Sequence, residues 1–181
     1  KGVLEYVEPE EEEAEALAAA VLESLEQALE GVEEARRAEG AKLAKVLAAQ
    51  LDRIAELVAA AAASPARSVD AIHARIKEQV ARLALASTSL DPVRLHQEAV
   101  LIATRCDIEE ELQRLAAHVA AAREMLTAAD AIGRKLDFLS QELNREANTL
   151  CAKANDSDLT RIGLSLKATI DQLREQVQNI E

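Results

Sequence analysis

Aromatic residues are nearly absent from this sequence of 181 residues, which contains one tyrosine, Tyr6, one phenylalanine, Phe138, and no tryptophan. Common single-strand nucleic-acid binders stack bases on several exposed aromatic side chains. The composition therefore argues against a base-stacking platform of that kind.

Cysteine and glycine are also scarce, with two and five residues respectively. Cys106 and Cys151 lie far apart and form no Cys-x-x-Cys or Cys/His ligand spacing, so neither a zinc site nor a disulfide framework is indicated. No phosphate-binding glycine loop or serine nucleophile motif is found. No apolar run approaches the ~20 residues that span a bilayer, and the start shows no secretory signal. We therefore expect a soluble cytoplasmic protein with no membrane partner.

The three prolines each follow a residue that can begin a helix, so Pro9, Pro65 and Pro92 mark three expected helix starts. The dominant residues are Ala, Leu, Glu, Arg and Gln, which lose least on entering a helix. This composition predicts an all-α fold of long antiparallel helices.

Apolar residues at helical spacing predict one very long helix, or two nearly collinear ones, from Pro9 to about Ala62. A second arm from Pro65 to the Ser87–Ser89 cluster would complete a helical hairpin. We expect residues 1–89 to form this linking or oligomerisation arm and residues 90–181 to form a C-terminal helical bundle. Whether the helix after Pro92 kinks, restarts or runs straight through Cys106 is left open.

The net charge of −12 is concentrated near the start of the chain. Residues 1–63 carry 6 basic and 15 acidic side chains, whereas residues 134–181 carry 7 and 8. A strongly acidic protein does not attract polyphosphate by its long-range field. This argument does not apply to residues 134–181, because their basic and acidic side chains nearly balance.

The segment after Gly133 carries the least ordinary pattern. Its predicted core positions are Leu136, Leu139, Leu143, Ala147 and Leu150. Asp137, Gln141, Asn144 and Asn148 follow one flank of that stripe. Asn is a poor helix former, so two on one face need compensation by a polar network or a bound ligand.

Glu142 and Glu146 are four residues apart on this helix and project together, with Arg134 and Arg145 nearby. Such a carboxylate pair can hold a hard divalent cation, and the arginines can bind phosphate. An ordinary surface ladder of ion pairs explains the same spacing.

On the preceding helix, His118 and Glu111 are seven residues apart and face the same way, close to Arg114. A histidine near neutral pKa can carry protons, but a lone histidine is more often a structural hydrogen-bonding group.

The run from Gly133 to Thr149 resembles the signature helix of the YicC family. The resemblance extends through Lys153–Asp156 and the ending Arg174–Glu181, and upstream through the pattern around Arg105–His118. It covers residues 91–181 well and residues 1–90 more loosely. Two positions depart from the family pattern: Cys151 replaces a small residue and Ser140 replaces an apolar one.

The resemblance implies an oligomeric, hexameric endoribonuclease that depends on divalent metal and cleaves RNA in the bacterial cytoplasm. Because the chain begins at Lys1 rather than Met, we expect it to be the C-terminal part of a longer protein, weak or inactive alone. The expected metal ligands are Glu142, Glu146 and Glu111, with His118 sharing the catalytic role and Mg²⁺ or Mn²⁺ as the ion. The expected RNA contacts are Arg134, Arg145, Gln141, Asn144 and Asn148. The alternative is a helical oligomerisation scaffold without catalysis.

Overall fold

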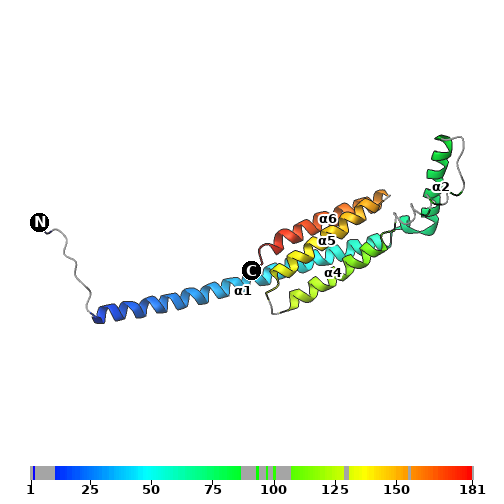
Figure 1. The fold of residues 1–181 in the computed structure, drawn as a ribbon. Coiled ribbons are helices and arrows are strands. Elements are labelled where there is room, and N and C mark those ends of the chain that lie inside the picture. The colour runs from blue at the N-terminus through cyan, green and yellow to red at the C-terminus, as the bar shows by residue number, and fades with distance from the viewer. Residues whose placement is uncertain are drawn as a thin grey trace. The chain divides into compact units, whose positions relative to one another are not determined.

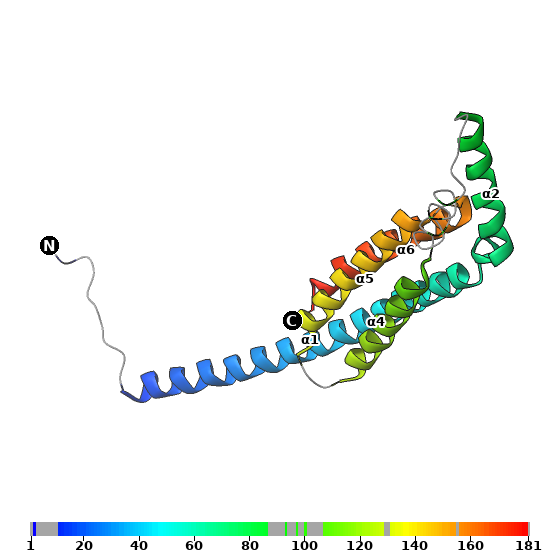
Figure 2. The same ribbon diagram turned by 45° about the vertical axis from the view of Figure 1, so that its right-hand side comes forward.

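The fold was analysed in a computed structural model, which describes residues 2, 11–86, 93, 97, 100, 107–128, 131–154 and 156–180 (Figures 1 and 2). These residues form helices and connecting turns and contain no strand, so the predicted all-α class is confirmed. The chain divides into two compact units, residues 1–43 and 44–181, each described by itself below. The boundary expected between residues 89 and 90 lies outside the described residues and stays a prediction.

Helix α1 (Glu11–Ala62) is a single helix of 52 residues, which is the first of the two alternatives that the apolar spacing left open. It passes without interruption through Gly31 and Gly40. In its part within the first unit, every described side chain from residue 14 to 42 is exposed. Burial begins in the second unit, at Leu47. The buried side chains of this part are Leu47, Leu51, Ile54, Leu57, Val58 and Ala61.

A 3-10 turn, η1 (Pro65–Arg67), and helix α2 (Val69–Ala86) follow. Ser64 caps the turn by accepting a hydrogen bond on Oγ from the Ala66 amide, and Pro65 takes the first position, where its missing N–H costs nothing. The helix start expected at Pro65 is therefore a short turn, after which α2 begins. Antiparallel packing of α2 against α1 stays a prediction, and the starts expected at Pro9 and Pro92 lie outside the described residues.

Three further helices complete the second unit: α4 (Glu109–Thr127), α5 (Gly133–Lys153) and α6 (Ser157–Val177). They run alongside residues 44–62 of α1 in both views (Figures 1 and 2). Leucines from α1, α5 and α6 and Leu126 of α4 surround one small apolar space, so the four segments share a core. The stripe predicted for α5 is buried at all five positions, which are Leu136, Leu139, Leu143, Ala147 and Leu150.

Aspartate side chains accept backbone hydrogen bonds at the starts of α6 and α4. Asp156 accepts hydrogen bonds from the amides of Asp158 and Leu159 and so starts α6. Asp107 and Ile108 are not helical, and Asp107 accepts from the Glu109 amide at 3.0 Å. Helix α4 therefore begins at Glu109, while Cys106 lies outside the described residues.

None of the helices in the described ranges combines the length and the apolarity that crossing a bilayer requires.

Candidate functional site

The candidate site lies along the contact between α4 and α5, where the edges of two buried stripes meet. On α4 the site residue His118 precedes the buried Val119. On α5 Glu142 precedes the buried Leu143, and Glu146 is itself only 3% exposed. Because residues four apart share a helix face, both carboxylates point toward α4. The core packing therefore fixes the direction of all three side chains.

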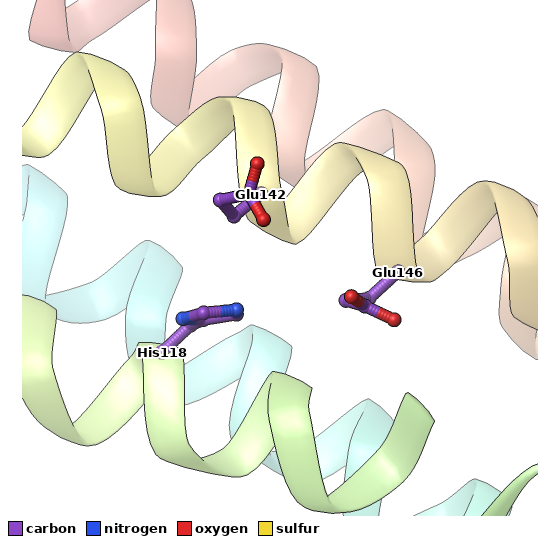
Figure 3. Close-up of side chains that lie close together, drawn as sticks. All are labelled: His118, Glu142 and Glu146. Carbon is purple, nitrogen blue, oxygen red and sulfur yellow. The ribbon is translucent and has the colours of Figure 1, made fainter. Parts of the chain in front are cut away.

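His118, Glu142 and Glu146 converge between the two helices (Figure 3). One imidazole nitrogen and one carboxylate oxygen from each glutamate all lie within 4.8 Å of one another. His118 and Glu142 are half-buried, and Glu146 is buried. Two carboxylates and an imidazole from rigid helices form a donor set suited to a divalent cation such as Mn²⁺ or Mg²⁺. The three side chains could hold such an ion, and the divalent cation expected from the sequence stays a prediction.

Arg114 fixes the buried carboxylate of this cluster. Its Nη1 donates to Oε1 of Glu146 at 3.1 Å, and its Nη2 donates to Oε1 of Glu110 at 2.6 Å. The pKa of the Arg114 guanidinium is raised, first by the hydrogen bond to Glu146 and then by the charge of Glu110. One glutamate oxygen is thereby held by the arginine, which leaves Oε2 as the oxygen not engaged in this pair. Arg114 was expected close to His118 and Glu111 but had no predicted role, although it lies four residues before His118.

Glu111 does not join the cluster, contrary to expectation. It precedes His118 by two helical turns, about 10 Å along the axis. There its Oε1 pairs with Nζ of Lys153 at 2.8 Å. Its Oε2 is buried without a hydrogen-bond partner. Glu111 and His118 both face α5, as their spacing of seven residues predicted. The residue of α5 that contacts Glu111 is Lys153, near the end of the helix, and not Glu142 or Glu146.

The asparagines also lie apart from the carboxylates. Asn144 is two residues beyond Glu142, which rotates it by about 200° around the helix. Its Nδ2 donates to Oδ1 of Asp171 on α6 at 2.8 Å, and its Oδ1 accepts from Nδ2 of Asn148 at 2.8 Å. Gln141 similarly donates to a carboxylate of its own helix. The expected polar network is present, but it faces α6, whereas the carboxylates of Glu142 and Glu146 face α4.

The two arginines predicted to bind phosphate lie on the solvent side of α5. The side chain of Arg145 is 71% exposed, and its Nη1 lies 4.0 Å from Oε2 of Glu142. Arg134 is likewise exposed. Phe138, which lies between Arg134 and Glu142 on the same face, is 61% exposed. The composition argued against a base-stacking platform and gave Phe138 no role, although its spacing of four residues from Glu142 was the available signal.

Comparison with known proteins identifies a family and several relatives. The chain matches the family described as endoribonuclease YicC-like, C-terminal, over residues 61–181. It is 50% identical over 96 residues to a protein of Haemophilus influenzae named probable endoribonuclease YicC, covering 53% of this chain and 33% of that protein. It is 31% identical over 175 residues to a protein of the same name from Clostridioides difficile, covering 97% of this chain and 60% of that protein. The chain thus spans less than two thirds of the length of either relative.

Proposed function

Because the chain belongs to the YicC-like endoribonuclease family, we propose that it forms part of an enzyme that cleaves RNA at internal phosphodiester bonds in the bacterial cytoplasm. The observation that carries the proposal is the convergence of His118, Glu142 and Glu146 from two helices. The names of the two relatives, probable endoribonucleases, support the same reaction.

In this proposal His118, Glu142 and Glu146 hold one divalent cation, Mg²⁺ or Mn²⁺. Such an ion, when bound, supplies a Lewis acid that stabilises charge on a phosphodiester and makes an attacking water or ribose hydroxyl more acidic. Glu146 offers the oxygen that Arg114 does not hold. Because its side chain is buried and hydrogen-bonded, it meets an ion with little loss of freedom.

The exposed side of α5 would hold the RNA backbone. Arg134 and Arg145 present guanidinium groups that bind phosphate through paired N–H donors. Gln141, Asn144 and Asn148 lie on the α6 side of the same helix, so any RNA contact they make is to a different part of the strand.

The test compares RNA cleavage by the full-length wild-type enzyme and by its Glu142→Gln, Glu146→Gln double variant, with Mn²⁺ and with EDTA. We expect Mn²⁺-dependent cleavage in the wild type and a loss of at least about 100-fold in the double variant, since two of three ion ligands lose their charge. Thermal unfolding checks that the variant folds.

The matched control is a Glu124→Gln, Glu175→Gln double variant, which removes the same charge from exposed positions of α4 and α6. It should cleave as the wild type does. Equal cleavage by the two double variants would remove Glu142 and Glu146 from the chemistry.

A second candidate is a helical assembly module, favoured by the exposed apolar side chains of α1. Six of them are between 53% and 65% exposed, namely Leu17, Val21, Leu22, Leu25, Leu29 and Val32. Such a surface is typical of helices that pair with other helices. The proposed homo-oligomer, a hexamer by family resemblance, would be compatible with either role.

Light scattering coupled to size-exclusion chromatography, combined with the cleavage assay, separates the two candidates. An oligomer that neither binds Mn²⁺ nor cleaves RNA would favour the scaffold. Cleavage that depends on Glu142 and Glu146 would favour the nuclease, whatever the subunit number.

A further inference from the structure

Phe138 is the single phenylalanine of the chain, and 61% of it is exposed on α5. The helix around it is otherwise well packed, since all five of its stripe positions are buried. A single exposed apolar residue is common on protein surfaces and needs no special explanation. What distinguishes Phe138 is its position relative to the candidate metal site.

Phe138 precedes Glu142 by four residues, so the two side chains are neighbours on one helix face, with Cβ atoms about 5–6 Å apart. Arg134 lies four residues before Phe138, and Arg145 lies three residues after Glu142. We call these four residues the outer strip of α5. Along it an exposed cation, an exposed aromatic ring, the carboxylate of Glu142 and a second exposed cation follow one another.

Each chemical feature of the outer strip has a counterpart in a single RNA strand. Guanidinium groups bind phosphates, and a bound cation neutralises the phosphate to be cleaved. An exposed ring stacks against any base, because every base has a π face. A partner helix of protein would need several apolar residues on this strip, and a bilayer would need more. The charges beside Phe138 therefore favour RNA over a protein or lipid partner.

We propose that Phe138 stacks against an unpaired nucleobase next to the nucleotide at the metal site and so selects single-stranded RNA. Bases in an RNA duplex are stacked on each other and do not offer a free face. The enzyme would accordingly bind single strands, loops and bulges better than duplexes. This inference rests on the proposed function, because it takes RNA as the substrate.

The absence of tryptophan gives a direct test by fluorescence. In a Phe138→Trp variant the introduced indole is the chain's only one, and an unpaired base stacked on it quenches its emission. Titration uses a short RNA of mixed sequence in EDTA, so that no cleavage occurs. We expect saturable quenching by the single strand and at least about fivefold weaker binding of the matched duplex.

The control variant is Leu164→Trp, which places an indole at a position on α6 that is 58% exposed and outside the strip. Its emission should change little with RNA. Equal quenching of the two variants would overturn the inference. A second outcome would also overturn the inference: the Phe138→Trp variant emits like a buried indole without RNA and does not respond when RNA is added. A second copy of the chain would then cover the position.

A substitution series distinguishes stacking from simple apolar contact. Phe138→Tyr should keep the RNA affinity, whereas Phe138→Leu and Phe138→Ala should each raise the dissociation constant roughly 5- to 100-fold. In the cleavage assay the loss should appear in KM, with kcat near the wild-type value. Leucine restoring full affinity would exclude stacking.

The two proposals fail in different ways. If the wild type does not cleave RNA with Mn²⁺ but the Phe138→Trp variant is quenched by single strands, the proposed nuclease activity fails and the stacking contact stands. If the wild type cleaves RNA and the indole is not quenched, the stacking contact fails alone. If neither signal is seen, both are rejected.

Discussion

Arg114 of α4 and Glu146 of α5 form an ion pair in which Nη1 of the arginine lies 3.1 Å from Oε1 of the glutamate. The glutamate side chain is 5% exposed, and the arginine side chain is 52% exposed. The pair therefore neutralises a buried carboxylate at the candidate metal site with a charge that still reaches solvent.

The first prediction concerns this ion pair. Arg114→Ala leaves the charge of Glu146 buried and close to that of Glu142, so the melting temperature in EDTA should fall. A divalent cation can replace the missing positive charge. We therefore expect Mn²⁺ to raise the melting temperature more in Arg114→Ala than in the wild type. Differential scanning fluorimetry measures both shifts.

Glu110→Gln is the matched control, because Glu110 is the second and exposed partner of Arg114. Its response to Mn²⁺ should equal that of the wild type. Identical Mn²⁺ shifts in Arg114→Ala and the wild type would mean that Glu146 takes no part in binding an ion.

The second prediction concerns the close approach of α5 and α6. A Cβ added at Gly163 would lie 2.5 Å from Sγ of Cys151 and 3.3 Å from Cδ2 of Leu150. Gly163→Ala should therefore lower the free energy of unfolding by about 1–3 kcal/mol, as overpacking of a core does. Urea denaturation measures the change.

Removal of the sulfur should relieve that clash. In a Gly163→Ala, Cys151→Ala double variant the unfolding free energy should recover part of the loss, which gives a non-additive mutant cycle. If the changes in unfolding free energy from the two substitutions simply add, the sulfur of Cys151 is not the reason for a glycine at position 163. The cycle also addresses why Cys151 stands where related sequences are expected to have a smaller residue.

The folding of α5 was predictable because one helix needs only its own periodicity. The spacing of Leu136, Leu139 and Leu143 fixed the buried stripe, and the same spacing put Glu142 and Glu146 on one side of it.

What the sequence left undetermined is which neighbour each edge of α5 meets. Glu111 and Asn144 were both assigned to the site because they share a face with other polar residues. In the structure α4 covers one edge and α6 the other, so Asn144 meets Asp171 while Glu111 meets Lys153. Tertiary pairing, which no single-helix pattern encodes, decides these contacts.

The third prediction concerns the nitrogen ligand. His118→Asn removes the imidazole while keeping a polar side chain, and we expect the dissociation constant for Mn²⁺ to rise about tenfold or more. The effect on Mg²⁺ should be smaller, because Mg²⁺ gains little from a nitrogen ligand compared with oxygen. Isothermal titration with each ion measures the two constants. His73→Asn, at an exposed position of α2, serves as control and should bind both ions as the wild type does.

The last prediction separates the two edges of α5. Asn144→Ala removes the donor to Asp171 and the acceptor for Asn148, so the free energy of unfolding should fall by about 1 kcal/mol. The core stripe lies between Asn144 and the carboxylate pair, so the Mn²⁺ dissociation constant should stay within about twofold of the wild type. Calorimetric titration and urea denaturation of the same preparation give both numbers. A tenfold loss of Mn²⁺ affinity would mean that the network on the α6 side controls the ion ligands through the helix, and the site would then have to include Asp171. An unchanged constant, together with a large loss for His118→Asn, would confine ion binding to the α4 edge.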